Sequence, residues 1–179
     1  MKWVIRILAG LVGLLLVGAM ILLALGQRHD AGVVRGSVEI ARSPEAVWPW
    51  LTDPAKLRTW VGWVVEIRNV STNDEIWVME DRNNGNARME IHASTMALDP
   101  PRRIVEHLSV PQSFQGNQEY RLTNLGGGRT RLEVEGHWHY DQWLFSLMEP
   151  LVTPEARKKL VEDLERLKSL IESSKGAGL

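Results

Sequence analysis

Two histidines near the carboxyl end of the chain have a spacing suited to binding a metal ion. His137 and His139 flank Trp138 in an alternating segment, so a strand would place both imidazoles on the same face. Imidazole is a common ligand of zinc and copper, but a stable site needs a third ligand. The same alternation places Glu133 and Glu135 beside the two histidines on the polar face. We therefore interpret both imidazoles as solvated side chains and predict no metal site.

Acid–base and nucleophilic chemistry find little support in the sequence. Glu106 and His107 are the nearest acid and base, but adjacent residues of a strand face opposite sides and do not cooperate directly. Cysteine is absent, which excludes thiol nucleophiles, disulfides and thiolate zinc sites. No serine lies in a nucleophile elbow, and no glycine-rich loop precedes a helix as a phosphate site requires. We therefore predict no catalytic residue and no cofactor.

The charge balance argues against a nucleic-acid partner. The 179 residues include 21 Lys and Arg against 22 Asp and Glu, for a net charge of −1. A nucleic-acid interface has a clustered excess of positive charge, and the sequence contains no such cluster. The hydrophobic fraction of 44% is that of an ordinary globular protein and excludes a disordered chain. The oligomeric state is left open.

The amino-terminal residues have the pattern of a membrane-spanning helix. An uninterrupted apolar run extends from Ile7 to Leu25, and as a helix it is long enough to cross a hydrocarbon core of roughly 30 Å. Lys2 and Arg6 precede the main run, and Trp3 occupies the position of an interfacial anchor. A cleaved signal peptide is the alternative, although the apolar core of such a peptide usually has only about 7–15 residues. We predict a retained single-pass anchor.

The chain divides into three parts. We predict a transmembrane anchor that contacts the membrane through residues 3–25, a short polar tether and one globular domain, over residues 1–26, 27–32 and 33–175 respectively. A short basic head before the first apolar span is typical of a signal anchor, so we expect the amino terminus inside and the domain outside the cytoplasm. Basic residues also follow the span and favour the opposite orientation.

The globular part combines helix and strand patterns in an α+β order. Alternating apolar residues predict a first strand over Val33–Ile40. Ser43-Pro44-Glu45 begins a short helix with a cap, a proline and an acid, and Asp53-Pro54 begins a second one. Thr153 caps a last helix over 154–173. This helix has an apolar stripe, and its charged residues, Asp163 among them, are assigned to the solvent side.

About six further strands are predicted between the second and the last helix, separated by Gly, Asn and Pro turns. In the first of them Trp63, Val65 and Ile67 share one face, and Val64 lies on the other. The final strand has the clearest alternation. Its apolar face consists of Thr130, Leu132, Val134, Gly136, Trp138 and Tyr140.

This order of elements resembles the START-like superfamily, also called SRPBCC, and is most similar to its polyketide cyclase/dehydrase-like branch. The resemblance is carried by SVEIARSPEAVWPWLTDPAKLRTW from Ser37 to Trp60 and by ARKKLVEDLERLKSLIE from Ala156 to Glu172. It implies a helix-grip fold, in which a curved seven-stranded antiparallel sheet surrounds a long carboxy-terminal helix and an apolar cavity lies between them. These motifs diagnose the fold and do not name a reaction.

The aromatic composition indicates where a ligand would bind. Eight Trp against two Tyr and two Phe is an unusual choice, although core packing accounts for most of these residues. Strand faces that point at the long helix supply better candidates, and methionines add an adaptable apolar wall. Residues 143–152 are apolar nearly all round, and they either pack fully or form a membrane-facing rim of the cavity. The predicted ligand-binding residues are Trp63, Met89, Tyr120, Trp138, Tyr140 and Met148.

These features predict a membrane-tethered module that binds or transports a hydrophobic small molecule, such as a lipid or an isoprenoid-like compound. A largely apolar cavity is suited to holding such a molecule and poorly equipped to transform it. The alternatives are an enzyme of the cyclase or dehydrase type, and a protein-interaction or chaperone-cofactor role. A buried Asp, Glu or His inside the cavity would favour the enzyme, and a closed cavity would favour the interaction role.

Overall fold

A curved sheet of seven antiparallel strands forms the centre of the domain. The computed structural model describes residues 2–26, 32–81 and 87–174, without the side chains of residues 23, 25, 81, 143–148, 150 and 151. The strand order is β1-β7-β6-β5-β4-β3-β2, so β1 closes one edge beside the last strand. The elements, in chain order, are α1 (Lys2–Gly26), β1 (Val33–Ile40), α2 (Pro44–Thr52), α3 (Pro54–Trp60), β2 (Val64–Asn69), β3 (Asp74–Asp81), β4 (Ala87–Asp99), β5 (Arg103–Val110), β6 (Phe114–Gly126), β7 (Arg129–Tyr140) and α4 (Trp143–Ser173).

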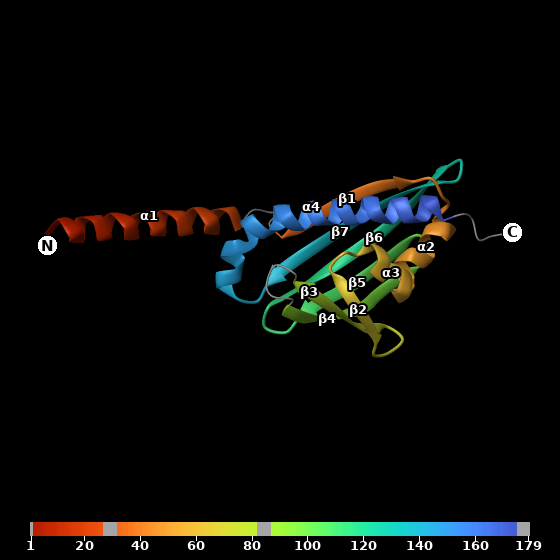
Figure 1. Cartoon of the computed structure of the whole chain (residues 1–179), viewed down its shortest axis with the longest axis horizontal. Helices are drawn as coiled ribbons and strands as arrows, with labels where there is room; N and C mark the ends of the chain where they lie inside the picture. The colour runs from red at the N-terminus through yellow and green to blue at the C-terminus, as the bar shows by residue number, and fades with distance from the viewer. Residues whose placement is uncertain (1, 27–31, 82–86, 175–179) are drawn as a thin grey trace.

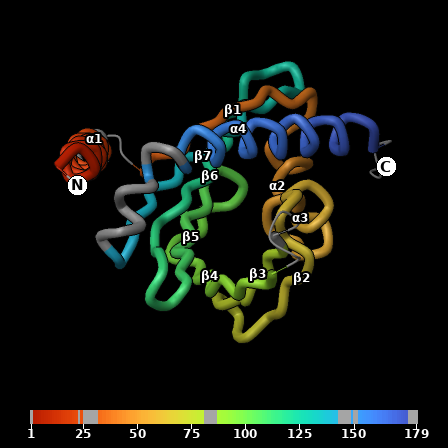
Figure 2. Tube along the Cα trace, turned by 60° about the vertical axis from the view of Figure 1, so that its left-hand side comes forward, coloured from red at the N-terminus to blue at the C-terminus, as the bar shows by residue number. Residues whose placement is uncertain are grey.

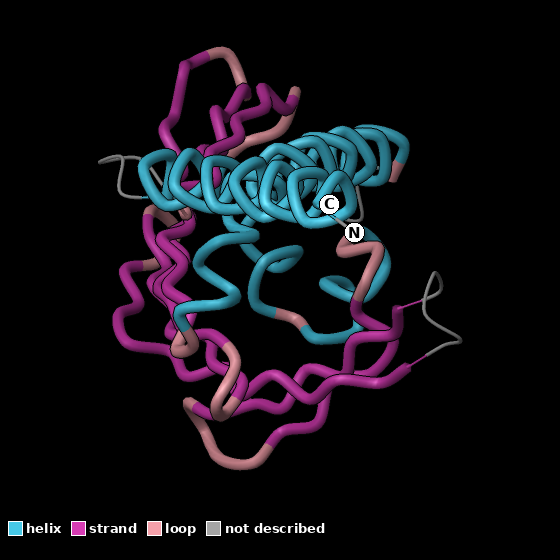
Figure 3. The backbone as a smooth tube through the Cα atoms, turned by 90° about the vertical axis from the view of Figure 1, so that its left-hand side faces the viewer, coloured by secondary structure: helices cyan, strands magenta, loops and turns pink. Residues whose placement is uncertain are grey.

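The sheet wraps around α4. Figures 2 and 3 show the long helix crossing one side of the molecule while the strands curve around the space beneath it. α4 packs directly on β1 and β7, and α3 contacts both α4 and β2. The two short helices therefore occupy the space between α4 and the far edge of the sheet.

Local sequence signals set the starts of α2 and α3. Pro44 is at the beginning of α2, where its missing N–H would have had no helical partner. Asp53 caps α3, because its Oδ1 accepts a 2.9 Å hydrogen bond from the backbone N–H of Ala55. Ser43 occupies the cap position of α2 but makes no side-chain cap bond. Both predicted helix starts are confirmed.

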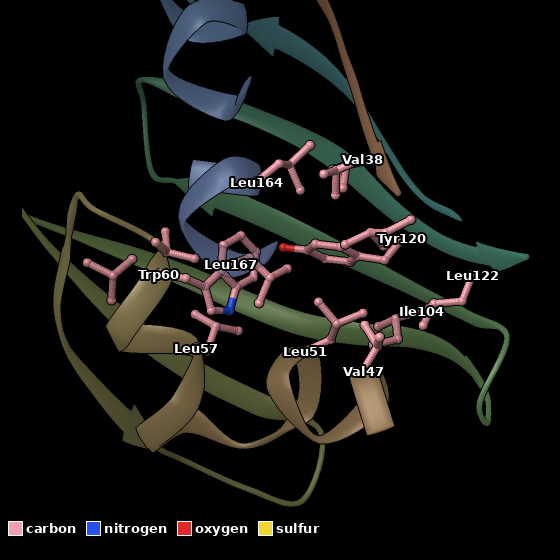
Figure 4. Close-up of a cluster of buried hydrophobic side chains, with 14 of the residues drawn as sticks. Val38, Val47, Leu51, Leu57, Trp60, Ile104, Tyr120, Leu122, Leu164 and Leu167 are labelled. Atoms are coloured by element: carbon pink, nitrogen blue, oxygen red, sulfur yellow. The ribbon is translucent and has the colours of Figure 1, made fainter. Parts of the chain in front are cut away.

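The main core lies where α2, α3 and the carboxy-terminal half of α4 meet the sheet (Figure 4). Trp60 is fully buried there, and its Nε1 donates a 2.9 Å hydrogen bond to the backbone oxygen of Trp50. Apolar side chains from all three layers surround it. The core includes Val47, Leu51, Leu57, Ile104, Leu132, Leu164, Leu167 and Ile171.

The predicted faces of β2 are wrong at one residue. Val64 is buried, although the alternation placed it on the face opposite Trp63, Val65 and Ile67. Its strand pairs with β3 through Val64–Met79 and then Glu66–Val78, a register shift that places an extra residue on β2. A β-bulge of this kind reverses the alternation, which sequence periodicity does not reveal.

The last helix begins earlier than predicted. α4 starts at Trp143 rather than after Thr153, so the apolar segment before Pro154 is helical and continuous with the rest. Pro150 and Pro154 each lack the N–H that an interior helical bond needs. The first turns of α4 accordingly run in a different direction from the long part (Figure 1).

α1 extends away from the domain and contacts it at α4 (Figure 1). Among the described residues it is the single helix whose length and apolar composition would suffice to cross a membrane, over Lys2–Leu22. Large apolar side chains are exposed along its length, with Trp3 74% exposed. A membrane span and a signal sequence both have this character.

Candidate functional site

A cavity of about 570 Å³ lies between the inner face of the sheet and the middle part of α4, residues 152–163. Its volume falls in the range of small-molecule sites, roughly 300–1,000 Å³. From α4 it is lined by Val152, Ala156 and Leu160 among others, and from the sheet by inward residues of several strands. The lining is mainly apolar and strongly aromatic, which suits a hydrophobic guest.

Two aromatic groups form opposite sides of this lining. Trp63 and Trp77, near β2 and on β3, have ring centroids 6.0 Å apart. Phe114 on β6 packs edge-on against Trp138 and Tyr140 of β7. Its ring centroid is 5.9 Å from that of Trp138 and 6.4 Å from that of Tyr140. Aromatic pairs of this geometry stabilise one another beyond the burial of their area, which favours the observed arrangement of both walls.

Two glycines make room for the indole of Trp138. Gly116 is its register partner on β6, where an added Cβ would lie 2.7 Å from Trp138 Cε3 and 2.2 Å from the His137 carbonyl oxygen. An added Cβ at Gly136 would lie 2.8 Å from Trp138 Nε1. Any side chain at either position would therefore displace the indole from the cavity wall.

Polar groups are few in the lining, and two of them are neighbours on the inner face of β6. Gln118 and Tyr120 both line the cavity, and Gln118 Nε2 donates a hydrogen bond to the Tyr120 hydroxyl. Burial, followed by the nearby carboxyl of Glu106, raises the pKa of Tyr120 well above its usual value, so the phenol stays neutral. These groups offer hydrogen bonds rather than charge.

Glu106 lies beside this pair with no compensating cation. Its side chain is buried, at 8% exposure, and its Oε2 has no hydrogen-bond partner among the residues that the structure describes. Burial first, and then the carboxylate of Glu75, raise its pKa to about 8. The carboxyl is therefore mostly protonated at neutral pH.

Asp163 connects α4 to the segment between α3 and β2. Its Oδ1 accepts hydrogen bonds from the Gly62 backbone N–H at 3.1 Å and from Arg166 Nη1 at 2.9 Å. Arg166 also donates to the Trp60 carbonyl oxygen at 2.9 Å. Burial raises the pKa of Asp163, against the lowering effect of these donors. The interaction holds the helix against one end of the cavity.

Four of the predicted ligand-binding residues are brought together at the cavity: Trp63, Tyr120, Trp138 and Tyr140. Their part in binding a ligand stays a prediction. Met89 on β4 does not line the cavity, and its side chain is 37% exposed. Met79, its register partner on β3, does line the cavity.

The segment before the long part of α4 is described only in part. The side chain of Met148 lies outside the described residues, as do most side chains of residues 143–151. Val152 at the end of this segment lines the cavity and is 42% exposed. This residue therefore reaches both the cavity and the surface.

Sequence reasoning missed three residues of the site. Asp163 was assigned to solvent, but it is only 4% exposed, because the helix turns this position toward Gly62 rather than toward water. Glu106 alternates with Ile104 and Leu108, and this spacing was the available signal that it faces inward. Gln118 lies two residues before Tyr120 on β6, and this spacing was the available signal that it faces the cavity.

The outward histidines behave as predicted. His137 and His139 are exposed on the outer face of β7, and His137 Nε2 lies 2.6 Å from Glu135 Oε1. Arg35 reaches the same carboxylate at 3.0 Å, and the two partners, Arg35 first, lower the pKa of Glu135 to about 2. Across the described part of the chain, no group of three His, Asp or Glu residues is arranged to hold a metal ion.

A second hollow lies on the outer face of the sheet, over β1, β6 and β7. Its volume is about 290 Å³, and most of its lining is charged. Arg35 and Arg121 at this place are already paired with Glu135 and Glu119. The larger apolar cavity is therefore the better candidate site.

Comparisons with known proteins agree with this geometry. A family model described as polyketide cyclase / dehydrase and lipid transport matches residues 31–172. No protein of curated function matches the chain.

Several solved structures share the fold. A START superfamily protein from Mycobacterium smegmatis is 16% identical with a TM-score of 0.67, and the match covers 80% of this chain and 99% of that one. A conserved protein from Geobacillus kaustophilus is 13% identical with a TM-score of 0.69, covering 79% and 96%. A protein from Deinococcus radiodurans is 19% identical with a TM-score of 0.59, covering 78% and 97%. The predicted helix-grip fold is thus confirmed.

Proposed function

The chain belongs to the polyketide cyclase/dehydrase and lipid transport family, and from this premise we propose that it holds or passes a hydrophobic small molecule at a membrane. The observation that carries the proposal is the cavity of about 570 Å³ with its two aromatic walls. An apolar guest would gain free energy by leaving water for this lining. We further propose that Trp63, Trp138, Tyr140 and Tyr120 contact it, with Val152 at the rim.

The apolar amino-terminal helix supports a role close to a bilayer. We propose that residues 1–26 form a retained anchor, residues 27–32 a tether and residues 33–175 the binding domain, placed outside the cytoplasm. The support is the exposure of large apolar side chains along α1, which lipid would cover. The alternative, a cleaved signal sequence, predicts a mature protein without these residues.

The position of the cavity favours exchange with the membrane. The stretch of α4 that lines the cavity, residues 152–163, is nearer to α1 than the packed carboxy-terminal stretch is (Figure 1). Val152, partly exposed at this end, gives an apolar edge to the opening. We propose that a lipid-like or isoprenoid-like molecule passes between bilayer and cavity at this edge.

A second candidate function is an enzyme of the cyclase or dehydrase type. The observation that favours it is the buried Glu106, because an acid with a pKa of about 8 is suited to proton transfer near neutral pH. Glu106 borders the lining without being part of it, however, and within the described residues no base is hydrogen-bonded to its Oε2. The proposal therefore remains binding, with proton transfer as the alternative.

The test is to identify what the full chain carries. The chain is purified in lipid nanodiscs, extracted with solvent, and compared by mass spectrometry with empty nanodiscs and with two variants, Trp138→Ala and His137→Ala. These residues are neighbours on β7 with opposite facing, so the pair separates the cavity from the outer surface. We expect a defined apolar molecule that is retained by the histidine variant and lost by the tryptophan variant. A chain that carries nothing beyond the nanodisc lipids, and takes up none added, would contradict the proposal.

A further inference from the structure

Glu106, Gln118 and Tyr120 form a polar cluster in an otherwise apolar and aromatic cavity region. We propose that this cluster binds an uncharged oxygen, a carbonyl or hydroxyl group, on a ring-bearing apolar ligand, with the Glu106 carboxyl as the hydrogen-bond donor. This inference rests on the proposed function and adds to it the chemical class of the ligand and the residue that selects it.

The sheet register places the three side chains side by side. Glu106 on β5 is the direct partner of Gln118 on β6, and Tyr120 is the next inward residue of β6. Gln118, Tyr120 and Leu108, the next inward residue of β5, all line the cavity. Glu106 therefore lies on the cavity side of the sheet, immediately next to the lining.

The hydrogen-bonding state of the cluster is incomplete. Gln118 and Tyr120 satisfy one another, but Glu106 Oε2 is buried without a partner. A buried polar atom left unpaired is costly, and native proteins seldom retain one without a reason. A ligand oxygen that reaches the floor of the cavity would supply the missing partner.

The charges around the cluster favour an uncharged oxygen group on the ligand over a carboxylate. Glu75 on β3 and Asp163 on α4 contribute carboxyl groups, and Tyr120 contributes a neutral phenol. The other charged residues of the lining are Glu80 and Lys159, and Lys159 is solvent-exposed. A fatty-acid carboxylate would be repelled here, whereas a ketone or an alcohol would not.

The aromatic side chains of the lining favour a ligand that contains planar rings. Trp63 with Trp77, and Phe114 with Trp138, present ring faces and edges to the cavity. Planar rings gain more from such walls than flexible chains of equal area do, because ring stacking adds to burial. The site therefore suits a neutral, oxygenated ring compound.

Three naphthalene probes test the proposal with the full chain in lipid nanodiscs. 2-Acetylnaphthalene carries the ketone, 2-ethylnaphthalene replaces the carbonyl by a methylene, and 2-naphthoate replaces it by a carboxylate. Binding is measured by equilibrium dialysis, with empty nanodiscs subtracted to remove partition into lipid. At pH 6 we expect the ketone to bind about tenfold more tightly than the hydrocarbon, the gain of one buried hydrogen bond, and the carboxylate to bind most weakly.

Two variants separate the Glu106 hydrogen bond from the rest of the cavity. Glu106→Leu, which has no donor, should lose the preference for the ketone while keeping its affinity for 2-ethylnaphthalene. Glu106→Gln keeps a donor and should keep the preference. In the wild type the preference should decrease between pH 6 and pH 9 as the carboxyl ionises, and in Glu106→Gln it should not change.

The outcomes distinguish this inference from the proposed function. If the chain carries an apolar molecule in the nanodisc extraction but binds none of the three probes, this inference is overturned and the proposed function stands. If it carries and takes up nothing, both are overturned. If ketone and hydrocarbon bind equally well, or if Glu106→Leu retains the preference, only the inference is overturned. Since Glu106→Gln preserves shape and hydrogen bonding, its result remains decisive even if the leucine variant does not fold.

Discussion

Leu160 and Leu167 lie two turns apart on the same face of α4, yet their surroundings differ. Leu167 is fully buried among the side chains of α2, α3 and the sheet, whereas Leu160 lines the cavity (Figure 4 shows the packed end). The difference follows from the short helices, which fill the space under the carboxy-terminal half of α4 and leave the half nearer to α1 without a second layer (Figure 2). One helix thus lines the cavity with residues 152–163 and packs into the core with the stretch that follows, residues 164–171.

The packed end and the cavity end also differ in their polar groups. Asp163, between the two, has its Oδ1 bonded to both Gly62 and Arg166. Glu106, on the cavity side, retains an unpaired buried oxygen. An unpaired buried oxygen lowers stability, so its presence indicates that the cavity region is not optimised for stability alone.

The largest expected effect is a loss of stability at the packed end. Leu167→Ala should lower the free energy of unfolding by about 3–5 kcal/mol, because it leaves a cavity in a filled core. Leu160→Ala, the matched control, should cost only about 1 kcal/mol, because its side chain already borders open space. Chemical unfolding of the full chain in mild detergent, followed by tryptophan fluorescence, measures both. Equal losses would remove the distinction between the two ends.

A pH-dependent effect is expected from Glu106. Its pKa is about 8 in the folded protein against 4.5 for an unperturbed glutamate, so the folded state binds the proton more tightly. The stability that Glu106 contributes is therefore complete below pH 4.5 and is lost as the pH rises to about 8, by at most ~1.4 kcal/mol per pH unit.

Glu106→Gln isolates this contribution, because all other groups titrate equally in both proteins. The variant should match the wild type in unfolding free energy at pH 4 and exceed it at pH 8. If the unfolding free energies of the two proteins change with pH in parallel, burial does not raise the pKa of the Glu106 carboxyl.

A moderate effect is expected at the boundary between the two ends. Asp163→Ala should lower the free energy of unfolding by about 1–3 kcal/mol, because the Gly62 N–H and Arg166 lose a buried acceptor. Glu162→Ala, at the exposed neighbouring position, is the control and should have little effect. Similar results for both variants would mean that Asp163 does not fasten α4.

The smallest expected effect is stabilisation by a bound probe. At ten times its dissociation constant, 2-acetylnaphthalene should raise the free energy of unfolding by about 1.4 kcal/mol. The gain should persist in Leu167→Ala, whose change lies at the packed end, and disappear in Trp138→Ala. Thermal unfolding of the three proteins with and without probe measures it. A gain lost in Leu167→Ala but kept in Trp138→Ala would reverse the assignment of the two ends.

Local patterns predicted much of this architecture. Three features depend on residues close together in the chain, and the structure has them as expected: the helix starts at Pro44 and Pro54, the facing of β7 and the apolar amino-terminal helix. For the same reason Trp138 and Tyr140 were correctly expected to face inward. The family resemblance supplied the curvature and the position of the cavity.

The sequence by itself determined which residues face inward and where most elements begin, because both depend on periodicity and caps. Only the tertiary structure decided which inward residues meet the core and which meet the cavity, since this depends on how far α2 and α3 extend beneath α4. The tertiary structure likewise decided three further features: the bulge at Val64, the presence of Met79 rather than Met89 in the lining, and the burial of Asp163. Each depends on a neighbour distant in the chain, and periodicity contains no information about such neighbours.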